Sequence, residues 1–357
     1  FIWVGQSNRS GRFTNGQTFS GGQPASVFDE SGAWANLTTN YKDPNESLFS
    51  VLPLLATHIT NHTGWPVAFV CRTTGATGLL APDADWASGG TEYNAAMTAV
   101  ANSEVNAANL ILWNQGERDA VNDIETAAYA AAESAMLDAM QAAQSALSGV
   151  KMVSDCLAGE NSGADATEDQ SKIQQAKIYN WDNDSDILPG ATGHDQNFSD
   201  DLHWKTDAQA TTLAARLWRA IKAAAYSGSE DARGPRFASA TYVGAVVTVN
   251  LTGGETPIAN GTVTTGWAVS DNNGARTVSS VATSGRVVTI TCDQALAEPI
   301  TVSYGRGNAA VGTTTVDGGS IATVPIESFV DKAVNAPVSA SPGGSSMLPG
   351  MSISLGM

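Results

Sequence analysis

The sequence F-I-W-V-G-Q-S-N occupies residues 1–8 and decides how the rest of the chain is interpreted. Its first four residues are apolar, which is typical of a short buried strand. Gly5 follows, and because glycine has no Cβ atom the backbone can turn sharply there. We therefore expect Ser7 to be exposed where the strand ends, in a position that suits a nucleophile.

A serine hydroxyl is a weak nucleophile unless a base, an orienting carboxylate and donors for an oxyanion accompany it. Three further blocks can supply these groups. In chain order they are R-T-T-G-A-T-G at 72–78, W-N-Q-G-E-R-D at 113–119 and D-D-L-H-W at 200–204. Ser7 alone would be interpreted as a turn serine, but the presence of all four blocks favours a nucleophile.

The four blocks, in this order, resemble those of the SGNH hydrolases. Within them they are most similar to the branch of sialate O-acetylesterases and plant-type acetylxylan esterases, carbohydrate esterase family 6. That branch is marked by G-Q-S-N, Q-G-E and D-x-x-H, and here D-L-H-W-K-T-D-A-Q also resembles the family's D-x-L-H-x-x-x-x-A-Q. The resemblance covers roughly residues 1–225. It implies a serine esterase that removes O-acetyl groups from carbohydrate, a polysaccharide or a sialic acid-type glycan, through an acyl-serine intermediate.

The resemblance also assigns the catalytic roles. Ser7 is the nucleophile, His203 accepts its proton, and Asp200 holds the imidazole in the tautomer that leaves one nitrogen free. Asp201 could replace Asp200 as the orienting carboxylate, but the D-x-x-H spacing selects Asp200.

An oxyanion hole is expected from backbone N–H groups and one side-chain amide. The N–H groups are those of Ser7 and Gly75. For the amide, the Q-G-E block makes Gln115 the first candidate and Asn114 the second, and both follow the same apolar run.

Two positions depart from the family pattern. Gly75-Ala76-Thr77 stands where G-G-T is usual, and it is compatible with a donor at Gly75 if φ at Ala76 is negative. Trp204 follows the histidine in place of proline or an aliphatic residue, and could stack on a sugar or simply pack. His194, in G-H-D-Q, could line the substrate pocket or be a solvated loop residue.

Other cofactor chemistry has little support in the sequence. His58 and His62 are four apart, but no carboxylate or cysteine accompanies them at ligand spacing, so we expect no metal site. Without a P-loop or G-x-G-x-x-G, no nucleotide cofactor is expected. Cys71, Cys156 and Cys292 are expected to be buried thiols.

Composition limits the partners. The formal charge of −17 and only 18 Lys and Arg residues argue against nucleic acid and against an anionic membrane surface. No run of 18 apolar residues predicts a membrane span. The chain begins with a strand and no Met, as a processed product does, and we expect an extracellular protein, secreted, on a cell surface or in a virion.

Apolar runs alternate with helical patterns through residue 226. Strands are expected at 67–71, 110–113 and 150–154, and helices at 93–105, 123–148 and 169–179. A last helix follows a capping box of Thr206 and Gln209. This alternation predicts a three-layer α/β/α parallel sheet with ligands at the carboxyl ends of its strands, where the blocks fall. Residues 9–46 are expected to form a long surface loop.

A second, smaller domain follows. Residues 227–234 form a linker, and residues 235–330 alternate at period two, which predicts an immunoglobulin-like β-sandwich after an esterase domain at 1–226. The Pro, Gly and Met-rich tail at 331–357 is assigned no fold.

Two alternatives remain open. The scaffold could be catalytically inactive and serve as a carbohydrate-binding protein or as a phage tail or surface adhesin. The β-sandwich could also act mainly in assembly, giving a homo-oligomer or attachment to a virion or cell surface through the C-terminal region.

Overall fold

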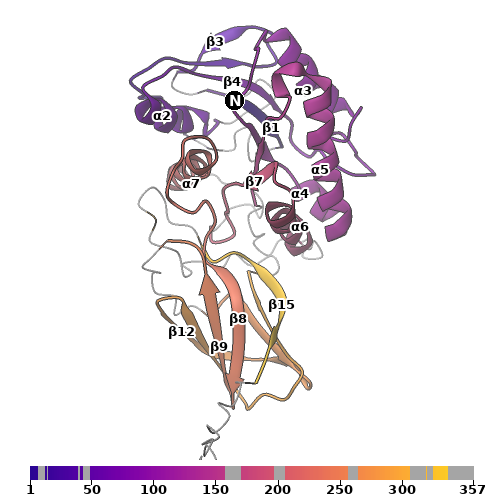
Figure 1. Ribbon diagram of the computed structural model, residues 1–357, viewed down its shortest axis with the longest axis vertical. Coiled ribbons are helices and arrows are strands. Elements are labelled where there is room, and N and C mark those ends of the chain that lie inside the picture. The colour runs from indigo at the N-terminus through magenta and orange to yellow at the C-terminus, as the bar shows by residue number, and fades with distance from the viewer. Residues whose placement is uncertain are drawn as a thin grey trace, which may run out of the picture.

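The computed structural model describes residues 1–6, 13, 15–38, 41–42, 49–156, 170–196, 206–255, 264–305, 319 and 325–336. Ser7, Asp200, Asp201, His203 and Trp204 lie outside the described residues. The described chain forms an α/β part, followed by a β part built from antiparallel strands (Figure 1).

The α/β part is built on one seven-stranded sheet of order β3-β2-β4-β1-β5-β6-β7. Neighbouring strands pair in parallel, except that β3 runs antiparallel to β2. The strands are β1 (Ile2–Gly5), β2 (Ala25–Phe28), β3 (Trp34–Asn36), β4 (Val67–Thr73), β5 (Ile111–Asn114), β6 (Met152–Ser154) and β7 (Ile187–Pro189). Leaving out β2 and β3, this is the flavodoxin-like order 2-1-3-4-5, in which the first strand in sequence lies between the second and the third.

Helices cover both faces of the sheet (Figure 1). One face carries α2 (Leu52–Thr63) and α7 (Asp207–Ala225). The other carries α3 (Thr91–Asn102), the short α4 (Glu117–Val121), α5 (Thr126–Ala143) and α6 (Gln170–Asn183), with a 3₁₀ turn at Ser145–Leu147. The predicted three-layer α/β/α arrangement is confirmed.

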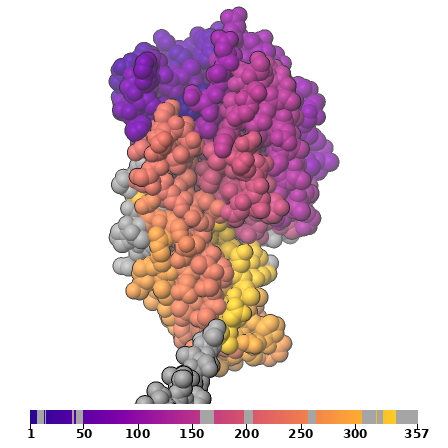
Figure 2. Space-filling model, viewed as in Figure 1, coloured from indigo at the N-terminus to yellow at the C-terminus, as the bar shows by residue number. Residues whose placement is uncertain are grey.

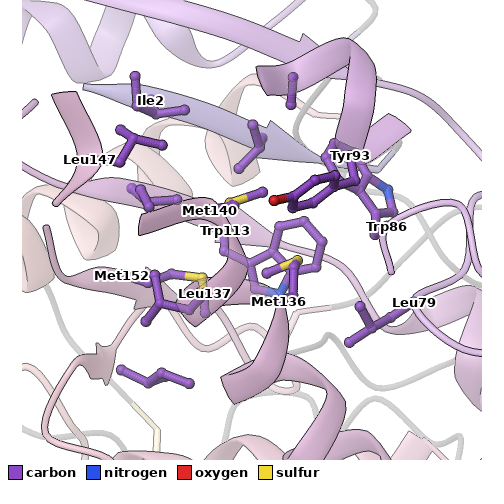
Figure 3. Packing of buried hydrophobic residues seen from close by; sticks show 14 of the residues in the cluster. Ile2, Leu79, Trp86, Tyr93, Trp113, Met136, Leu137, Met140, Leu147 and Met152 are labelled. Atoms are coloured by element: carbon purple, nitrogen blue, oxygen red, sulfur yellow. The ribbon is translucent and has the colours of Figure 1, made fainter. Parts of the chain in front are cut away.

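Strand residues alternate between the two cores, as the pleat of a sheet requires. Ile2 and Val4 pack under α3 and α5, whereas Trp3 packs under α2 and α7. On the α5 side Trp113 meets Trp86 edge to face, with ring centroids 5.1 Å apart, beside Met136 (Figure 3). Packing of these buried aromatic and sulfur-containing side chains stabilises the end of β5 against the helices on this face of the sheet.

The helix ends follow the expected signals. α2 ends at Gly64, which adopts a left-handed conformation. α7 begins with the predicted capping box, in which the Thr206 hydroxyl accepts from the N–H of Gln209 and the Gln209 side chain accepts from the N–H of Thr206. The start of α7 is therefore precisely anchored.

A buried ion pair lies beneath β6. Nζ of Lys177 on α6 is 2.9 Å from Oε1 of Glu133 on α5, and it also donates to the hydroxyl of Ser154 at 2.9 Å. Asn180 donates to the second carboxylate oxygen at 2.8 Å. Each charge is compensated by hydrogen bonds, as burial demands.

The expectation of one surface loop over residues 9–46 is wrong, because β2 and β3 lie within it. β2 has four residues, with Ser26 between apolar neighbours, and β3 has three exposed residues that pair only with β2. Strands this short give almost no periodic signal.

The described residues of the β part include eight strands, which form two four-stranded antiparallel sheets of order β11-β10-β14-β15 and β12-β13-β9-β8. They are β8 (Arg236–Val243), β9 (Val246–Thr252), β10 (Trp267–Asp271), β11 (Gly274–Arg276), β12 (Val278–Ser284), β13 (Val287–Cys292), β14 (Ile300–Tyr304) and β15 (Phe329–Val334). Side chains of both sheets share one core, as in a β-sandwich. β15 extends past residue 330, where the sequence had suggested that the sandwich ends.

The three cysteines are free and buried, as predicted. Burial raises the pKa of Cys156 to about 12, which makes its thiol unreactive.

Within the described residues, no helix is long and apolar enough to cross a membrane, and no three His, Cys, Asp or Glu side chains form a group that could hold a metal ion. His62 packs its ring against Trp218, with centroids 5.0 Å apart.

Candidate active site

Three chain segments converge where β1 ends. The N–H of Gln6 donates to the carbonyl oxygen of Asn114 at 2.8 Å, and the N–H of Thr74 donates to the carbonyl of Gly5 at 3.0 Å. Gly5 has φ +140°, and a Cβ atom there would lie 2.0 Å from the Asn114 oxygen. Only glycine fits, so the sharp turn expected after the first strand has a clear steric cause. Ser7 is the second residue after this point in the sequence.

The sheet topology marks the same place as a binding site. β1 is flanked by β4 and β5, and the chain crosses to opposite sides of β1 to form them. In open α/β sheets, ligands bind at such a reversal, outside the carboxyl ends of the strands. The G-Q-S-N, R-T-T-G-A-T-G and W-N-Q-G-E blocks all begin or end there.

Three consecutive backbone N–H groups of the block after β4, those of Gly75, Ala76 and Thr77, have no hydrogen-bond acceptor among the described residues. Gly75 is half-buried. Ala76 has φ +58° and is exposed, so the condition of a negative φ at Ala76 is not met. Alanine in this left-handed conformation costs about 1–2 kcal/mol relative to glycine. Alanine in place of the second glycine of G-G-T therefore strains the backbone, but it leaves the N–H of Gly75 without an acceptor among the described residues.

Gln115 is fully buried, and its amide is used within the protein. Its Nε2 donates to the carbonyl oxygen of Thr77 at 3.0 Å and to a carboxylate oxygen of Asp119, while Oε1 accepts from the Tyr129 hydroxyl at 2.8 Å. An amide nitrogen has two hydrogens, and both are engaged. Gln115 thus anchors the loop that carries Gly75. Its role as the oxyanion amide stays a prediction.

The side chain of Asn114 points to the face of the sheet that α2 and α7 cover. Leu110 and Leu112 pack on the α7 side and Trp113 on the α5 side, so the alternation of the strand turns Asn114 toward α7. Its Nδ2 makes one long hydrogen bond, 3.3 Å to Oδ2 of Asp155. Its buried Oδ1 has no partner among the described residues. Asn114, the second candidate, therefore has a side-chain N–H to offer.

Asp119 explains how the two middle blocks are joined. Its carboxylate accepts the backbone N–H groups of Leu79 at 2.8 Å and Leu80 at 2.9 Å. Burial raises the pKa of Asp119, although these hydrogen bonds and that of Gln115 oppose the shift. Asp119 thus fixes the segment that directly follows the 72–78 block.

Asp155, which the sequence analysis did not single out, links β6 to the loop before the last block. One of its oxygens accepts the N–H of Ala191 at 2.9 Å, and the other accepts Asn114 Nδ2. Gly190 has no room for a side chain here, since a Cβ atom would lie 2.3 Å from Asp155 Oδ1. A polar residue directly after an apolar run is the signal that could have identified it.

His194 is not a solvated residue. The side chain is buried, and its Nε2 donates to the carbonyl oxygen of Ile326 at 2.9 Å. The expectation of a solvated loop residue is therefore wrong, because its partner comes from the β part, 132 positions away.

The segments that flank the first and last blocks touch each other. Nδ2 of Asn15 donates to Oδ2 of Asp207 at 3.0 Å, and Nε2 of Gln17 lies 3.3 Å from Oδ1 of the same carboxylate. Asn15 and Asp207 are 192 positions apart. Asp207 is the first residue of α7 and stands four residues after His203.

Comparison with known families gives the class of protein. A family model described as carbohydrate esterase, sialic acid-specific acetylesterase, matches residues 1–223. The chain belongs to this family. This carbohydrate esterase hydrolyses O-acetyl esters of carbohydrate, as its sequence blocks imply. No curated protein matches the chain.

Solved structures of similar fold extend the comparison. The carbohydrate acetylesterase XAC1771 from Xanthomonas citri has a TM-score of 0.66 and 14% identity, over 92% of this chain and 80% of that chain. A protein from Arabidopsis thaliana has a TM-score of 0.50 and 16% identity, over 64% and 97%. NanS has a TM-score of 0.43 and 11% identity, over 62% and 96%. At these identities the likeness to XAC1771 shows that the fold is shared across both parts of this esterase.

Proposed function

We propose that this carbohydrate acetylesterase works through an acyl-serine intermediate, with Ser7 as nucleophile, His203 as base and Asp200 as the orienting carboxylate. The observation that carries the proposal is the pair of hydrogen bonds from Asn15 and Gln17 to Asp207. They join a segment eight residues after the serine to a carboxylate four residues after the histidine. Because these two segments are held together, the catalytic blocks next to them in the sequence can meet above the carboxyl end of β1.

In the first half of the reaction, Ser7 Oγ attacks the acetyl carbonyl carbon and His203 takes the hydroxyl proton. The carbonyl π electrons move to oxygen, which becomes an oxyanion. As the carbonyl reforms, the C–O bond to the sugar breaks and His203 returns the proton to the sugar oxygen. The products are acetyl-Ser7 and the free sugar hydroxyl.

In the second half, a water molecule attacks the acetyl-serine and gives its proton to His203. The C–O bond to Ser7 then breaks, Ser7 recovers its proton, and acetate leaves. Both halves pass through an oxyanion, so the same donors serve twice. Losing one such donor typically costs about 10²–10³ in rate.

For these donors we propose the backbone N–H groups of Ser7 and Gly75 and the side-chain amide of Asn114. The choice is supported by the N–H of Gly75, which has no acceptor among the described residues, and by the amide of Asn114, whose one hydrogen bond among them is long. Gln115 is assigned instead to holding the Gly75 loop, because its two amide hydrogens are already engaged. Trp204 remains a candidate for stacking on a sugar ring.

The test is acetate release from a panel of substrates by the parent protein and by Ser7→Ala. The panel contains acetylated xylan, O-acetylated sialic acid and a chromogenic acetate. We expect turnover by the parent and loss of at least about 10³-fold in the variant. Equal release by both proteins would reject the serine mechanism. Binding of the glycans with no turnover of any ester would instead indicate an inactive adhesin.

A further inference from the structure

The loop that leads into the D-D-L-H-W block touches the β part. His194 is 1% exposed, and its Nε2 donates to the Ile326 carbonyl at 2.9 Å. Its ring lies edge-on to Tyr304 of β14, with centroids 6.1 Å apart. Gly305 also lies next to the ring, since a Cβ atom there would be in van der Waals contact with His194 Cδ2 at 3.4 Å. The imidazole is therefore held against the sandwich on two sides.

The next residue binds the same loop to α7. Asp195 forms a two-pronged ion pair with Arg216, with both N–O distances at 2.7 Å, and Arg216 also donates to the carbonyl of Thr192 at 2.7 Å. Burial raises the pKa of Asp195, but the attraction and hydrogen bonds of Arg216, together with smaller effects of His194 and Gln196, hold that pKa below its usual value. The carboxylate is thus charged and fixed at neutral pH.

Other contacts hold the sandwich in place. Gln175 on α6 donates to the carbonyl of Ser328 at 3.2 Å. In the segment predicted to be a linker, Arg233 donates twice to Glu327 at 2.6 Å and also pairs with Asp182 on α6. The β part adjoins the α/β part directly in the space-filling view (Figure 2). Residues 326–328 therefore form a common docking point for α6, the linker and the His194 loop.

We propose that His194 is a positioning residue through which the β-sandwich fixes the loop that carries Asp200 and His203. This inference rests on the proposed serine mechanism. Nine residues, 197–205, separate Gln196 from Thr206, and both flanks are anchored: one by His194 and Asp195, the other by the capping box of α7. A displacement of about 1 Å in a catalytic group can cost about 10²-fold in rate.

The proposal gives the sandwich a function in catalysis. It predicts that the bond between His194 and Ile326 affects kcat, because the loop positions the base. KM should be nearly unchanged, because residues outside this loop are untouched. Burial keeps His194 neutral by lowering its pKa, so one ring N–H is available and it points at Ile326.

The test compares His194→Leu, which removes the donor, with His194→Gln, which retains an N–H at the same reach. Both are assayed with a chromogenic acetate at a temperature at which circular dichroism shows each variant to be fully folded. We expect His194→Leu to lower kcat at least about 10-fold with KM within about 2-fold, and His194→Gln to recover most of kcat.

Gln175→Ala is the matched control, because it removes a hydrogen bond between the same two parts but leaves the bond between His194 and Ile326 in place. It should leave kcat unchanged. If His194→Leu does not fold, Gly305→Ala supplies a milder change. Its methyl group would lie 3.0 Å from Cβ of Ser328, within the 326–328 segment that His194 bonds, so it should shift that segment and lower kcat in the same way.

A kcat equal to that of the parent in the His194→Leu variant would overturn the proposal. If that variant does not fold, a parent-like kcat in Gly305→Ala would overturn it. An equal fall in the Gln175→Ala control would overturn it too, since a purely structural role predicts that result. Failure of the serine mechanism is separate: it would show as acetate release by the parent that does not depend on Ser7.

Discussion

The carbonyl oxygen of Asn114 occupies the space that a side chain on Gly5 would need, 2.0 Å from the ideal Cβ position. Gly5→Ala should therefore push β1 from β5 at the point where the catalytic blocks meet. We expect the free energy of unfolding to fall by at least about 3 kcal/mol, measured by chemical denaturation, because a backbone clash is added to the strain of φ +140°.

Gly149→Ala is the control for this substitution. Gly149 also has a positive φ, +68°, but nothing lies within 4 Å of its Cβ position. It should lose only about 1 kcal/mol, the cost of the left-handed conformation. Equal losses in the two variants would mean that the contact with Asn114 is unimportant.

Ala76→Gly should stabilise the protein. Ala76 is exposed and has φ +58°, so glycine relieves strain at no cost in packing. The expected gain is about 0.5–1 kcal/mol, because glycine also gives the unfolded chain more freedom. Thermal unfolding measures it, and kcat should be unchanged since the Gly75 N–H stays in place. A lower melting temperature would count against the left-handed conformation.

Substitutions of Asn114 and Gln115 separate a chemical role from a structural one. Asn114→Ala should lower kcat by about 10²–10³ with little effect on stability, since it removes an oxyanion donor. Gln115→Ala should lower the free energy of unfolding by about 2 kcal/mol, because buried groups of Asp119 and Tyr129 lose their partner. The reverse result, a stable but inactive Gln115 variant beside an active Asn114 variant, would restore Gln115 as the donor.

Stability should depend on pH through His194. Burial lowers the pKa of His194 below its usual 6.5, although attraction by Asp195 opposes the shift. Below pH 6.5 the unfolded chain therefore binds a proton that the folded protein does not, so stability falls as the pH is lowered. His194→Gln should flatten the change in unfolding free energy between pH 7 and 5. Burial also lowers the pKa of His58, which contributes equally in both proteins. An identical pH dependence in the variant would be contrary to this expectation.

Periodic segments made much of the fold predictable. The apolar runs of β4 and β5 and the capping box of α7 lie where the sequence indicates, because local patterns determine them. The short strands β2 and β3 were missed, because β2 is stabilised by pairing with β4 and β3 by pairing with β2, and strands of four and three residues carry no period. The ion pair of Glu133 and Lys177 was equally invisible, because it joins two helices across 44 positions.

At the site, the sequence found the segments but not every role. The I-L-W-N pattern of β5 contains the alternation that turns Asn114 toward α7, and that signal could have ranked it above Gln115. His194 could not have been placed, because its burial depends on Ile326 in the sandwich. Ser7, Asp200 and His203 lie outside the described residues, so their roles stay predictions.

The most direct measurement is the site of covalent modification by a fluorophosphonate ester, a reagent that phosphonylates activated serines. Peptide mass spectrometry of the treated protein should find a single adduct, on Ser7, and its formation should slow at least about 10²-fold in His203→Ala. An adduct on another residue, or one on Ser7 that forms at the same rate without His203, would contradict the serine mechanism.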